Sequence, residues 1–423
     1  MIFLVVFKKF LRSQIVVAIG FMAMNLGNYA TSMLAGRALP ASTFGSYIGI
    51  TALVSVVTTV GGLTQPIITN SVAQSELRDE RESAEFLASI LGRVTTLIVG
   101  LSFGWALLLP VVFKVFEEDA RSSVAVSIIF VLLATLLPAL VGISHGLLNF
   151  TVFTFAFMIG GLSRPLIFLV VVEFNQTLLA PLLALNFSLA LTCLILIAKL
   201  PGGLKIFRSF TRPHALRLNR NIISSSAMIL SIALLSYSDV IVARTNLRGE
   251  DVGNFAAAAM LTNVCLYGSM IVVSVLIPYV SRNRNLYSSE VRLARWSIII
   301  VVLIGTCYSF FLLFYGQDLV SFTLGSQYSV EPRFFFFYNT VFVGVALCSL
   351  IVNFSVTKQS SQKMTFIFVA HSLLYLFALV ITGNSMNAIV ALTGATALSL
   401  ILSSLCFKDS ILRVALTPVE VTQ

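Results

Sequence analysis

The chain has 423 residues, of which 58% are hydrophobic and only 10% are charged, and its mean hydropathy is +0.98. A soluble domain carries about 25% charged residues, so this chain has too few charges to cover a surface that faces water. The composition excludes an ordinary soluble protein and indicates a chain embedded in lipid.

The first 12 residues do not follow the order of a signal peptide. A signal peptide places its basic residues before its apolar stretch, whereas here MIFLVVF precedes Lys8, Lys9 and Arg12. We predict that residues 1–12 form a short amphipathic helix that lies on the inner surface of the membrane.

Long apolar runs then recur to the end of the chain. A membrane-spanning helix needs about 20 mostly apolar residues, and only helices or closed barrels satisfy their backbone groups in lipid. These runs are continuous and do not alternate, which favours helices. The sequence contains twelve of them: 14–35, 45–68, 87–112, 123–147, 153–174, 177–198, 222–243, 254–279, 294–315, 333–355, 364–383 and 387–407. We predict an all-α integral membrane protein with about 12 transmembrane helices.

The distribution of Lys and Arg sets the expected orientation. With an inside N-terminus, 20 of the 27 basic residues fall in inner segments, six fall in outer segments, and Arg164 falls in a span. This bias follows the positive-inside rule and places both termini in the cytoplasm. The net charge of +10 then reflects topology and attraction to anionic lipids, and nucleic acid is not an expected partner.

The longest loop, residues 199–221, carries six Lys or Arg and no acid, and six spans lie on each side of it. Its Pro and Gly residues mark a linker. We predict a six-helix half over 13–200, a basic cytoplasmic linker over 201–221, a second six-helix half over 222–407 and a cytoplasmic tail over 408–423.

The two halves begin alike. Residues 35–53 read AGRALPASTFGSYIGITAL and residues 243–261 read ARTNLRGEDVGNFAAAAML. The pattern pairs Arg37 with Arg244, Phe44 with Val252, Gly45 with Gly253 and Tyr47 with Phe255. Repeats of one orientation, related by an axis along the membrane normal, are a known transporter plan. The alternative is that any helical hairpin has a glycine and an aromatic residue at its turn.

The same stretches resemble the polysaccharide transporter family of bacteria, the O-antigen-type flippases for lipid-linked oligosaccharides. The similarity lies in Asp239, Arg244, Val252-Gly253-x-Phe255 and Ile277-Pro278, and in Gly36-Arg37-x-Leu39 with Phe44-Gly45-x-Tyr47. That family belongs to a larger superfamily of multidrug, oligosaccharidyl-lipid and polysaccharide exporters. The resemblance implies two six-helix bundles related by a pseudo-two-fold axis, V-shaped around a central cavity that passes a polyprenyl-diphosphate-linked glycan.

Polar residues in the first span are candidates for the cavity. Asn25, Asn28 and Tyr29 have the i, i+3 and i+4 spacing that places them on one helix face. Amides and aromatic rings suit sugars, so these residues are candidate substrate ligands. Hydrogen bonding between helices is the alternative.

Several arginines stand at predicted span ends. Arg37 and Arg244 lie at the outer ends of the first and seventh spans, and Arg93 lies near the inner start of the third. They are candidates for cationic rings that bind an anionic cargo. Ordinary anchoring at the membrane interface is the alternative.

Arg164 lies within the fifth span, in the sequence Gly160-Gly161-Leu-Ser163-Arg164-Pro165. A charge inside the bilayer is a functional candidate by default, and the planar guanidinium suits a diphosphate. The glycines and the proline suggest a thinned or kinked helix. The alternative is that Arg164 lies near the inner interface and extends to the lipid headgroups.

Asp239 is the acid of the seventh span. It is a candidate site for coupling to H⁺ or Na⁺, because a carboxylate in a cavity can change its charge during transport. Two alternatives are that it orients a cavity arginine and that it holds two helices together. The aromatic run 334–338, in contrast, is interpreted as a lipid-facing and interfacial cluster.

The motif search excludes several activities. The chain has no GxxxxGK[ST] phosphate loop, no HExxH and no CxxC. The longest predicted outer loop, about 316–332, has only Asp318 and Glu331 as acids, which disfavours a glycan polymerase or ligase. No catalytic residue, metal site or resident cofactor is predicted.

We therefore expect a non-enzymatic flippase of the bacterial inner membrane. It would move an undecaprenyl-diphosphate-linked oligosaccharide by ion-coupled alternating access, for O-antigen and lipopolysaccharide biosynthesis. Expected partners are membrane lipids and the polymerase and chain-length regulator of that assembly. The alternatives are a multidrug or cation antiporter of the same superfamily and a membrane glycan polymerase or ligase.

Overall fold

We describe the fold from a computed structural model of the chain. The structure describes residues 2–62, 64–74, 80–115, 121–174, 177–200, 203, 220–264, 266, 287–357, 362–407 and 410–416. Most of the predicted linker 201–221, the span 254–279 beyond residue 266 and the tail beyond residue 416 lie outside these residues.

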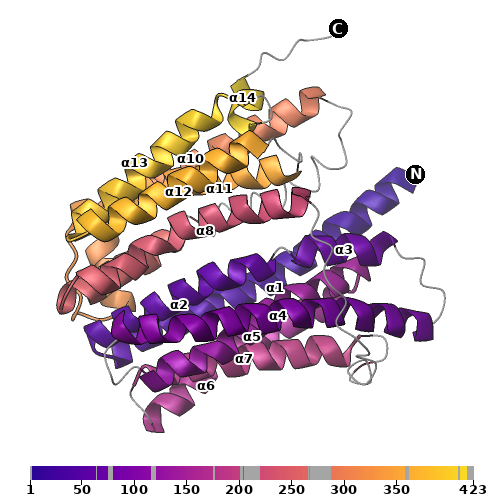
Figure 1. The fold of residues 1–423 in the computed structure, drawn as a ribbon, viewed down its shortest axis with the longest axis horizontal. Coiled ribbons are helices and arrows are strands. Elements are labelled where there is room, and N and C mark those ends of the chain that lie inside the picture. Colours follow the sequence, from indigo (N-terminus) through magenta and orange to yellow (C-terminus); the bar gives the residue numbers. More distant parts are fainter. Residues whose placement is uncertain are drawn as a thin grey trace. The chain divides into compact units, whose positions relative to one another are not determined.

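The described part of the chain is helical throughout, with no strand (Figure 1). The helices of its first part are α1 (Ile2–Ala38), α2 (Ala41–Gly62), α3 (Thr64–Gln74), α4 (Glu80–Val115), α5 (Arg121–Gly146), α6 (Phe150–Phe174) and α7 (Leu179–Ala198). Those of its second part are α8 (Arg220–Asn246), a helix over residues 250–264, α10 (Tyr287–Thr323), α11 (Pro332–Thr357), α12 (Gln362–Thr382), α13 (Met386–Ser404) and α14 (Ile411–Leu416).

Eleven helical segments of the described residues are long and apolar enough to cross a membrane. Each coincides with one of the twelve predicted spans, and the remaining prediction, 254–279, begins with the helix over 250–264. The agreement follows from composition, because uninterrupted apolar runs of this length are stable in lipid only as helices. The chain is thus an all-α, multi-pass membrane protein.

The chain divides into two compact units. The first unit contains residues 1–43 and 57–217, and the second contains residues 44–56 and 218–423. The division at 217–218 falls in the predicted linker. Residues 44–56 differ from the predicted halves, because they form the first part of α2 but belong to the second unit.

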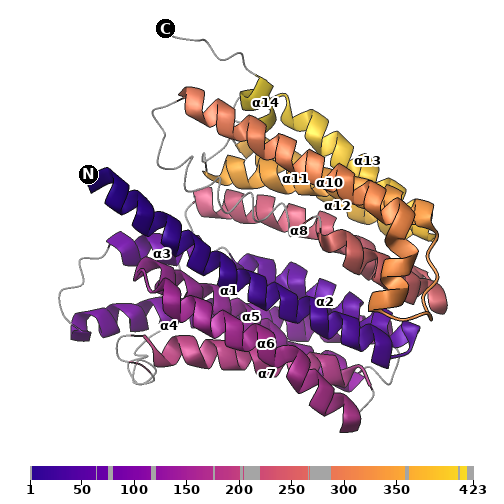
Figure 2. The ribbon, with the colours of Figure 1, turned by 180° about the vertical axis from the view of Figure 1, so that it is seen from behind.

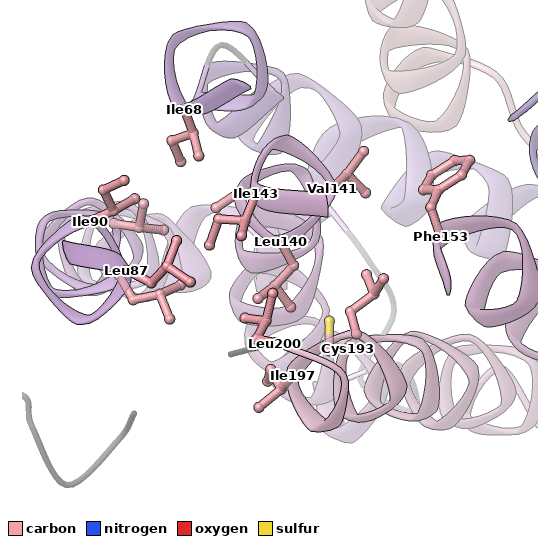
Figure 3. Close-up of a cluster of buried hydrophobic side chains, with 14 of the residues drawn as sticks. Ile68, Leu87, Ile90, Leu140, Val141, Ile143, Phe153, Cys193, Ile197 and Leu200 are labelled. Carbon is pink, nitrogen blue, oxygen red and sulfur yellow. The ribbon is translucent and has the colours of Figure 1, made fainter. Parts of the chain in front are cut away.

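In the first unit α6 packs between α1 and α7, and α5 packs against α3, α4 and α7 (Figure 2). Its core is a cluster of aliphatic side chains with Phe153 and Cys193, contributed by α1 and α3–α7 (Figure 3). In the second unit α11 contacts α8, α10 and α13, and α12 contacts α8 and α13. Each unit therefore buries its own core.

Two details differ from the sequence-based predictions. α1 runs from Ile2 to Ala38 as one helix, so residues 2–12 continue directly into the first span. α10 extends to Thr323, so the outer loop predicted to begin at 316 begins only after it. Val320 and Leu324 are fully buried, and these apolar contacts explain why the helix continues past Gln317 and Asp318.

Buried hydroxyl groups are numerous in both units. Thr31, Thr192 and Ser236 each donate a hydrogen bond of 2.8 Å to the carbonyl oxygen four residues earlier in their own helix. Such bonds satisfy a hydroxyl without water. They explain how these helices carry Ser and Thr in an apolar environment.

Candidate functional site

Arg164 lies inside the first unit. It stands in the middle of α6 with only 4% of its surface exposed. Its Nε donates a hydrogen bond of 2.7 Å to Oγ of Ser188 on α7, and its Nη2 lies 3.7 Å from Sδ of Met24 on α1. The guanidinium is thus enclosed by three helices. The side chain of Arg164 is held within the helix bundle and does not lie on its exposed surface.

The glycines before Arg164 allow this enclosure. A Cβ on Gly27 would lie 1.9 Å from the carbonyl oxygen of Gly161, and a Cβ on Gly160 would lie 1.9 Å from Oγ1 of Thr192. Only residues without a side chain fit there, as in the small-residue contacts of membrane helices. The Gly160-Gly161 pair brings α6 close to both neighbours, and this close packing places Arg164 against Met24 and Ser188.

Asp239 lies inside the second unit and has no exposed surface. Its Oδ2 accepts a hydrogen bond of 2.5 Å from the hydroxyl of Tyr338 on α11, and its Oδ1 accepts one of 2.8 Å from the backbone N–H of Val240. Both carboxylate oxygens therefore face hydrogen donors. Among the described residues Asp239 is paired with a phenol and a backbone amide, so the alternative that it orients an arginine is not supported.

The environment of Asp239 contains two further polar pairs. Thr262 lies within hydrogen-bond reach of the Tyr338 hydroxyl. The hydroxyl of Tyr375 lies 2.9 Å from Oγ1 of Thr393, and Tyr375 is close enough to Asp239 to interact with its charge. These groups come from α8, α11, α12, α13 and the helix over 250–264. The carboxylate thus lies in a buried region to which five helices contribute polar side chains.

Tyr338 is the contact that sequence reasoning missed. The run 334–338 was expected to face lipid, but Phe335 and Tyr338 are fully buried while Phe337 is 62% exposed. The prediction failed because an aromatic run on a helix faces several directions at once. The hydroxyl of Tyr338 was the available signal in the sequence. A tyrosine hydroxyl that is buried in a helix bundle needs a hydrogen-bond partner.

The other candidates of the first span do not share one environment. Asn25 is exposed, whereas Asn28 and Tyr29 are half-buried. Oδ1 of Asn28 is buried and has no hydrogen-bond partner among the described residues. Met24, which contacts Arg164, lies one residue before Asn25. The structure therefore places Arg164 beside the helix that carries these candidates.

The arginines of the span ends also differ. Arg37 and Arg93 are exposed, whereas Arg244 is half-buried at the end of α8. Nε of Arg244 donates a hydrogen bond of 2.8 Å to Oγ of Ser46 in the second unit. Next to it, a Cβ on Gly45 would lie 2.5 Å from Cγ1 of Val252. The two similar stretches found in the sequence thus contact each other through Gly45, Ser46, Arg244 and Val252.

Metal ligation was also considered. Within the ranges that the structure describes, no three His, Cys, Asp or Glu side chains are grouped so that they could hold a metal ion. The chemistry available at the buried sites is therefore that of a guanidinium, a carboxylate, phenols and hydroxyls.

Sequence comparison gives no relatives, since no protein-family model and no curated protein matches the chain. Comparison of folds, in contrast, finds solved structures that are similar to the chain. An inward-facing multidrug resistance transporter of the MATE family, in the MOP superfamily, has a TM-score of 0.63 and 16% identity over 96% of this chain and 100% of that chain. The lipid II flippase MurJ, in an inward closed conformation, has a TM-score of 0.62 and 13% identity over 95% of this chain and 90% of that one.

A third similar structure is a MOP superfamily transporter from Pyrococcus furiosus that is described by a reverse polarity of its binding pocket. It has a TM-score of 0.55 and 15% identity, covering 96% of this chain and 95% of that chain. These proteins are transporters and a flippase. The chain has their fold, which supports the predicted two-half helical architecture.

Proposed function

We propose that this protein is a flippase that moves a polyprenyl-diphosphate-linked oligosaccharide across the bacterial cytoplasmic membrane. The observation that carries the proposal is Arg164, a guanidinium buried among α1, α6 and α7. A charge inside membrane helices is expensive and is retained chiefly for function. A guanidinium suits a diphosphate because its planar donors match pairs of phosphate oxygens.

Other observations agree with an anionic cargo. Arg37 and Arg244 add positive charge near the ends of α1 and α8, and Arg93 adds it within α4. The fold is also that of a protein named as a lipid II flippase. We place Arg164, Arg37, Arg244, Arg93, Asn25, Asn28 and Tyr29 on the path of the cargo, and assign the cargo to O-antigen or related surface polysaccharide assembly.

Asp239 is proposed as the coupling group. A carboxylate that changes its proton or ion occupancy changes the charge inside the second unit, and its hydrogen bond with Tyr338 must adjust to that change. Because Tyr338 lies on α11 and Asp239 on α8, the adjustment is transmitted between helices. Binding and release of H⁺ or Na⁺ at Asp239 would in this way drive alternating access.

The test uses a strain from which the gene is deleted. The expected result is loss of the surface glycan with accumulation of the lipid-linked repeat unit on the cytoplasmic face, restored by the wild-type gene. A lipid-linked unit that reaches the outer face but stays unpolymerised would overturn the flippase assignment and favour a polymerase or ligase.

A multidrug or cation antiporter is the second candidate function. It is favoured by the fold match to a multidrug resistance transporter and by Asp239, since a buried acid suits a cationic drug. Deletion would then leave the glycan unchanged and increase drug sensitivity. Uptake of a cationic dye by proteoliposomes containing the protein, driven by an imposed ion gradient, separates this function from glycan export.

The proposal includes a location and partners. Both termini lie in the cytoplasm of the inner membrane, and the flippase supplies its product to the polymerase and the chain-length regulator. Fusion of a reporter enzyme to each terminus tests the orientation. Co-purification with the polymerase from detergent-solubilised membranes tests the association.

A further inference from the structure

Asp239 lies between two hydrogen-bond donors that approach its two oxygens. Oδ1 accepts from the backbone N–H of Val240 at 2.8 Å, and Oδ2 accepts from the hydroxyl of Tyr338 at 2.5 Å. The side chains of Asp239 and Tyr338 have no exposed surface. The arrangement suits an ionised carboxylate, because an ionised carboxylate offers an acceptor to each donor.

A neutral carboxyl group requires different hydrogen bonds at the same place. The N–H of Val240 is fixed by the backbone of α8, so a proton on Oδ1 would face another proton. The added proton must therefore lie on Oδ2, where it donates to the hydroxyl oxygen of Tyr338. The hydroxyl proton of Tyr338 must then turn to a second acceptor, because a buried donor without an acceptor is destabilising.

Thr262 supplies that second acceptor. It has no exposed surface, and it lies within hydrogen-bond reach of the Tyr338 hydroxyl. Its own hydroxyl proton is directed to the carbonyl oxygens of Ala258 and Ala259, each 3.1 Å from Oγ1. Because the proton of Thr262 is used within its own helix, the lone pairs of Oγ1 can accept from Tyr338.

These three side chains can therefore satisfy both charge states of the carboxyl group. When Asp239 is charged, Tyr338 donates to it. When Asp239 is neutral, it donates to Tyr338, and Tyr338 donates to Thr262. The change between the two states needs one proton on Oδ2 and the rotation of one hydroxyl group.

The same geometry disfavours a metal cation between the carboxylate and the phenol. Na⁺ is close in size to Ca²⁺, which bonds oxygens at about 2.3–2.6 Å, so the oxygens of two side chains on one such ion lie about 3 Å or more apart. Oδ2 of Asp239 and the hydroxyl oxygen of Tyr338 are 2.5 Å apart. A proton fits between two oxygens at this separation, whereas Na⁺ would have to push them apart.

The titratable groups that face Asp239 from neighbouring helices are phenols. Tyr338 comes from α11, and Tyr375 from α12 is close enough to interact with the charge of Asp239. The helix over 250–264 and α13 contribute the hydroxyls of Thr262 and Thr393. Four charged side chains of these helices lie at exposed helix starts: Glu250, Asp251, Arg333 and Lys363. Since phenols stay neutral at about pH 7, Asp239 is the group of this region whose charge changes.

We propose that the coupling ion is H⁺, and that Tyr338 and Thr262 form a hydroxyl pair that reverses its hydrogen bonds when Asp239 gains or loses the proton. On protonation the proton adds to Oδ2, and the O–H of Tyr338 turns from Oδ2 to Oγ1 of Thr262. On release both changes are reversed. The inference rests on the proposed function in one respect, namely that Asp239 is the coupling group, and it does not depend on the identity of the cargo.

The first experiment identifies the ion that changes the charge of Asp239. The purified full-length protein is titrated with acid in detergent, while infrared difference spectra record the carbonyl stretch of neutral carboxyl groups. We expect a band that appears as the pH falls and that is missing in the Asp239→Asn variant. Replacement of choline chloride by NaCl at constant ionic strength should leave the midpoint of this band unchanged.

Two outcomes of this titration overturn the inference. A midpoint that moves to lower pH in NaCl means that Na⁺ competes with the proton at Asp239. Absence of the Asp239 band at every pH at which the protein stays folded means that the carboxyl group does not take up a proton.

The second experiment tests the hydroxyl pair. Thr262→Val removes the acceptor that Tyr338 needs when Asp239 is neutral, so the neutral form loses a hydrogen bond and the midpoint should move to lower pH. We expect a shift of about one pH unit, which is a tenfold loss of proton affinity. Thr262→Ser keeps the hydroxyl and should titrate like the wild type. Thr262→Ala removes the same acceptor without a branched side chain, and it replaces Thr262→Val if that variant does not fold.

Thr323→Val is the matched control. Like Thr262, Thr323 is a buried residue of the second unit, and its hydroxyl donates to two carbonyl oxygens of its own helix, those of Leu319 and Val320. It lies on α10, which contributes none of the polar groups described beside Asp239. The control should leave the midpoint unchanged. Equal midpoints in Thr262→Val and Thr323→Val overturn the role of Thr262.

These measurements use no cargo, so they separate the inference from the proposed function. Protonation of Asp239 with the expected Thr262 shift, in a protein whose deletion leaves the surface glycan unchanged, supports the inference and rejects the proposed cargo. Loss of glycan export on deletion, together with a carboxyl group that stays charged, supports the flippase and rejects H⁺ as the coupling ion.

Discussion

The two units hold their buried charges in different ways. In the first unit Arg164 is enclosed by close helix packing at glycines, with a serine hydroxyl and a methionine sulfur as contacts. In the second unit Asp239 is held by hydrogen bonds from Tyr338 and from the backbone of Val240. Close helix packing surrounds the base, which also donates a hydrogen bond to Ser188, and donors on Tyr338 and Val240 hold the acid.

The difference has a consequence for function. A guanidinium enclosed where α1, α6 and α7 meet closely moves only if these helices move, whereas a carboxylate held by hydrogen-bond donors can respond to a proton or an ion in place. The first unit is therefore suited to a fixed positive site, and the second to a site whose charge changes. The following substitutions test this contrast.

The largest effect is expected from Gly161→Leu. A Cβ at this position would lie 2.4 Å from the carbonyl oxygen of Ala23, so α1 and α6 must separate. Overpacking usually costs about 1–3 kcal/mol and occasionally more, and contact with backbone belongs to the upper end. We expect little folded protein, as measured by thermal stability in detergent.

Gly100→Leu is the matched control. Gly100 lies on α4 of the same unit, and a Cβ there meets no atom within 4 Å. This substitution should leave the melting temperature unchanged within a few degrees. Equal stability of the two variants would contradict the role of close glycine packing.

The second effect is the loss of coupling in Asp239→Asn. The amide oxygen still accepts from Tyr338, the amide NH2 replaces the oxygen that accepts from Val240, and the side chain no longer changes its charge. We expect ion-driven transport to fall about 5–150-fold, the range of typical coupling free energies, at near-normal protein levels. A variant that transports like the wild type in proteoliposomes with an imposed ion gradient would leave Asp239 a structural role only.

Arg164→Ala should impair export and also remove a charged hydrogen bond to Ser188, which contributes about 1.5–3 kcal/mol. Arg164→Lys keeps the positive charge and should restore export in part. The amount of surface glycan made by the deletion strain that carries each variant gene measures the export by that variant. Lys199→Ala is the control because Lys199 is an exposed base of the same unit that is not placed on the cargo path, and its stability should change by about 0.5 kcal/mol or less. If the Arg164→Ala variant exports normally at normal protein levels, Arg164 does not lie on the cargo path.

The smallest effect is expected from Tyr338→Phe. It deletes one hydroxyl and leaves Oδ2 of Asp239 without its donor, at a cost of about 1–3 kcal/mol. The expected result is a lower unfolding temperature with a shifted pH dependence of transport, since the carboxylate loses the bond that favours its charged form. Phe335→Leu, at a buried neighbouring position on α11, should reduce stability but leave the pH dependence unchanged. A shift common to both variants would indicate general loosening of α11.

Part of the candidate site followed from the sequence. Arg164 and Asp239 were found because a charge in an apolar run of about 20 residues has few explanations. Their contacts were not predictable, because Ser188 and Met24 are 24 and 140 residues from Arg164, and Tyr338 is 99 residues from Asp239. Periodicity indicates which residues share a helix face, but it does not identify the helix that the face meets.

The sequence by itself determined the class of the protein and its membrane-spanning helices, since apolar runs of this length have one stable backbone conformation in lipid. It also showed the similarity between residues 35–53 and 243–261. Only the tertiary structure decided that Gly45 and Ser46 contact Val252 and Arg244, that Tyr338 is buried against Asp239 and that α2 is divided between the units. The physical reason is that local hydropathy selects helices, whereas the choice of neighbour depends on the fit of small and polar side chains that are far apart in the chain.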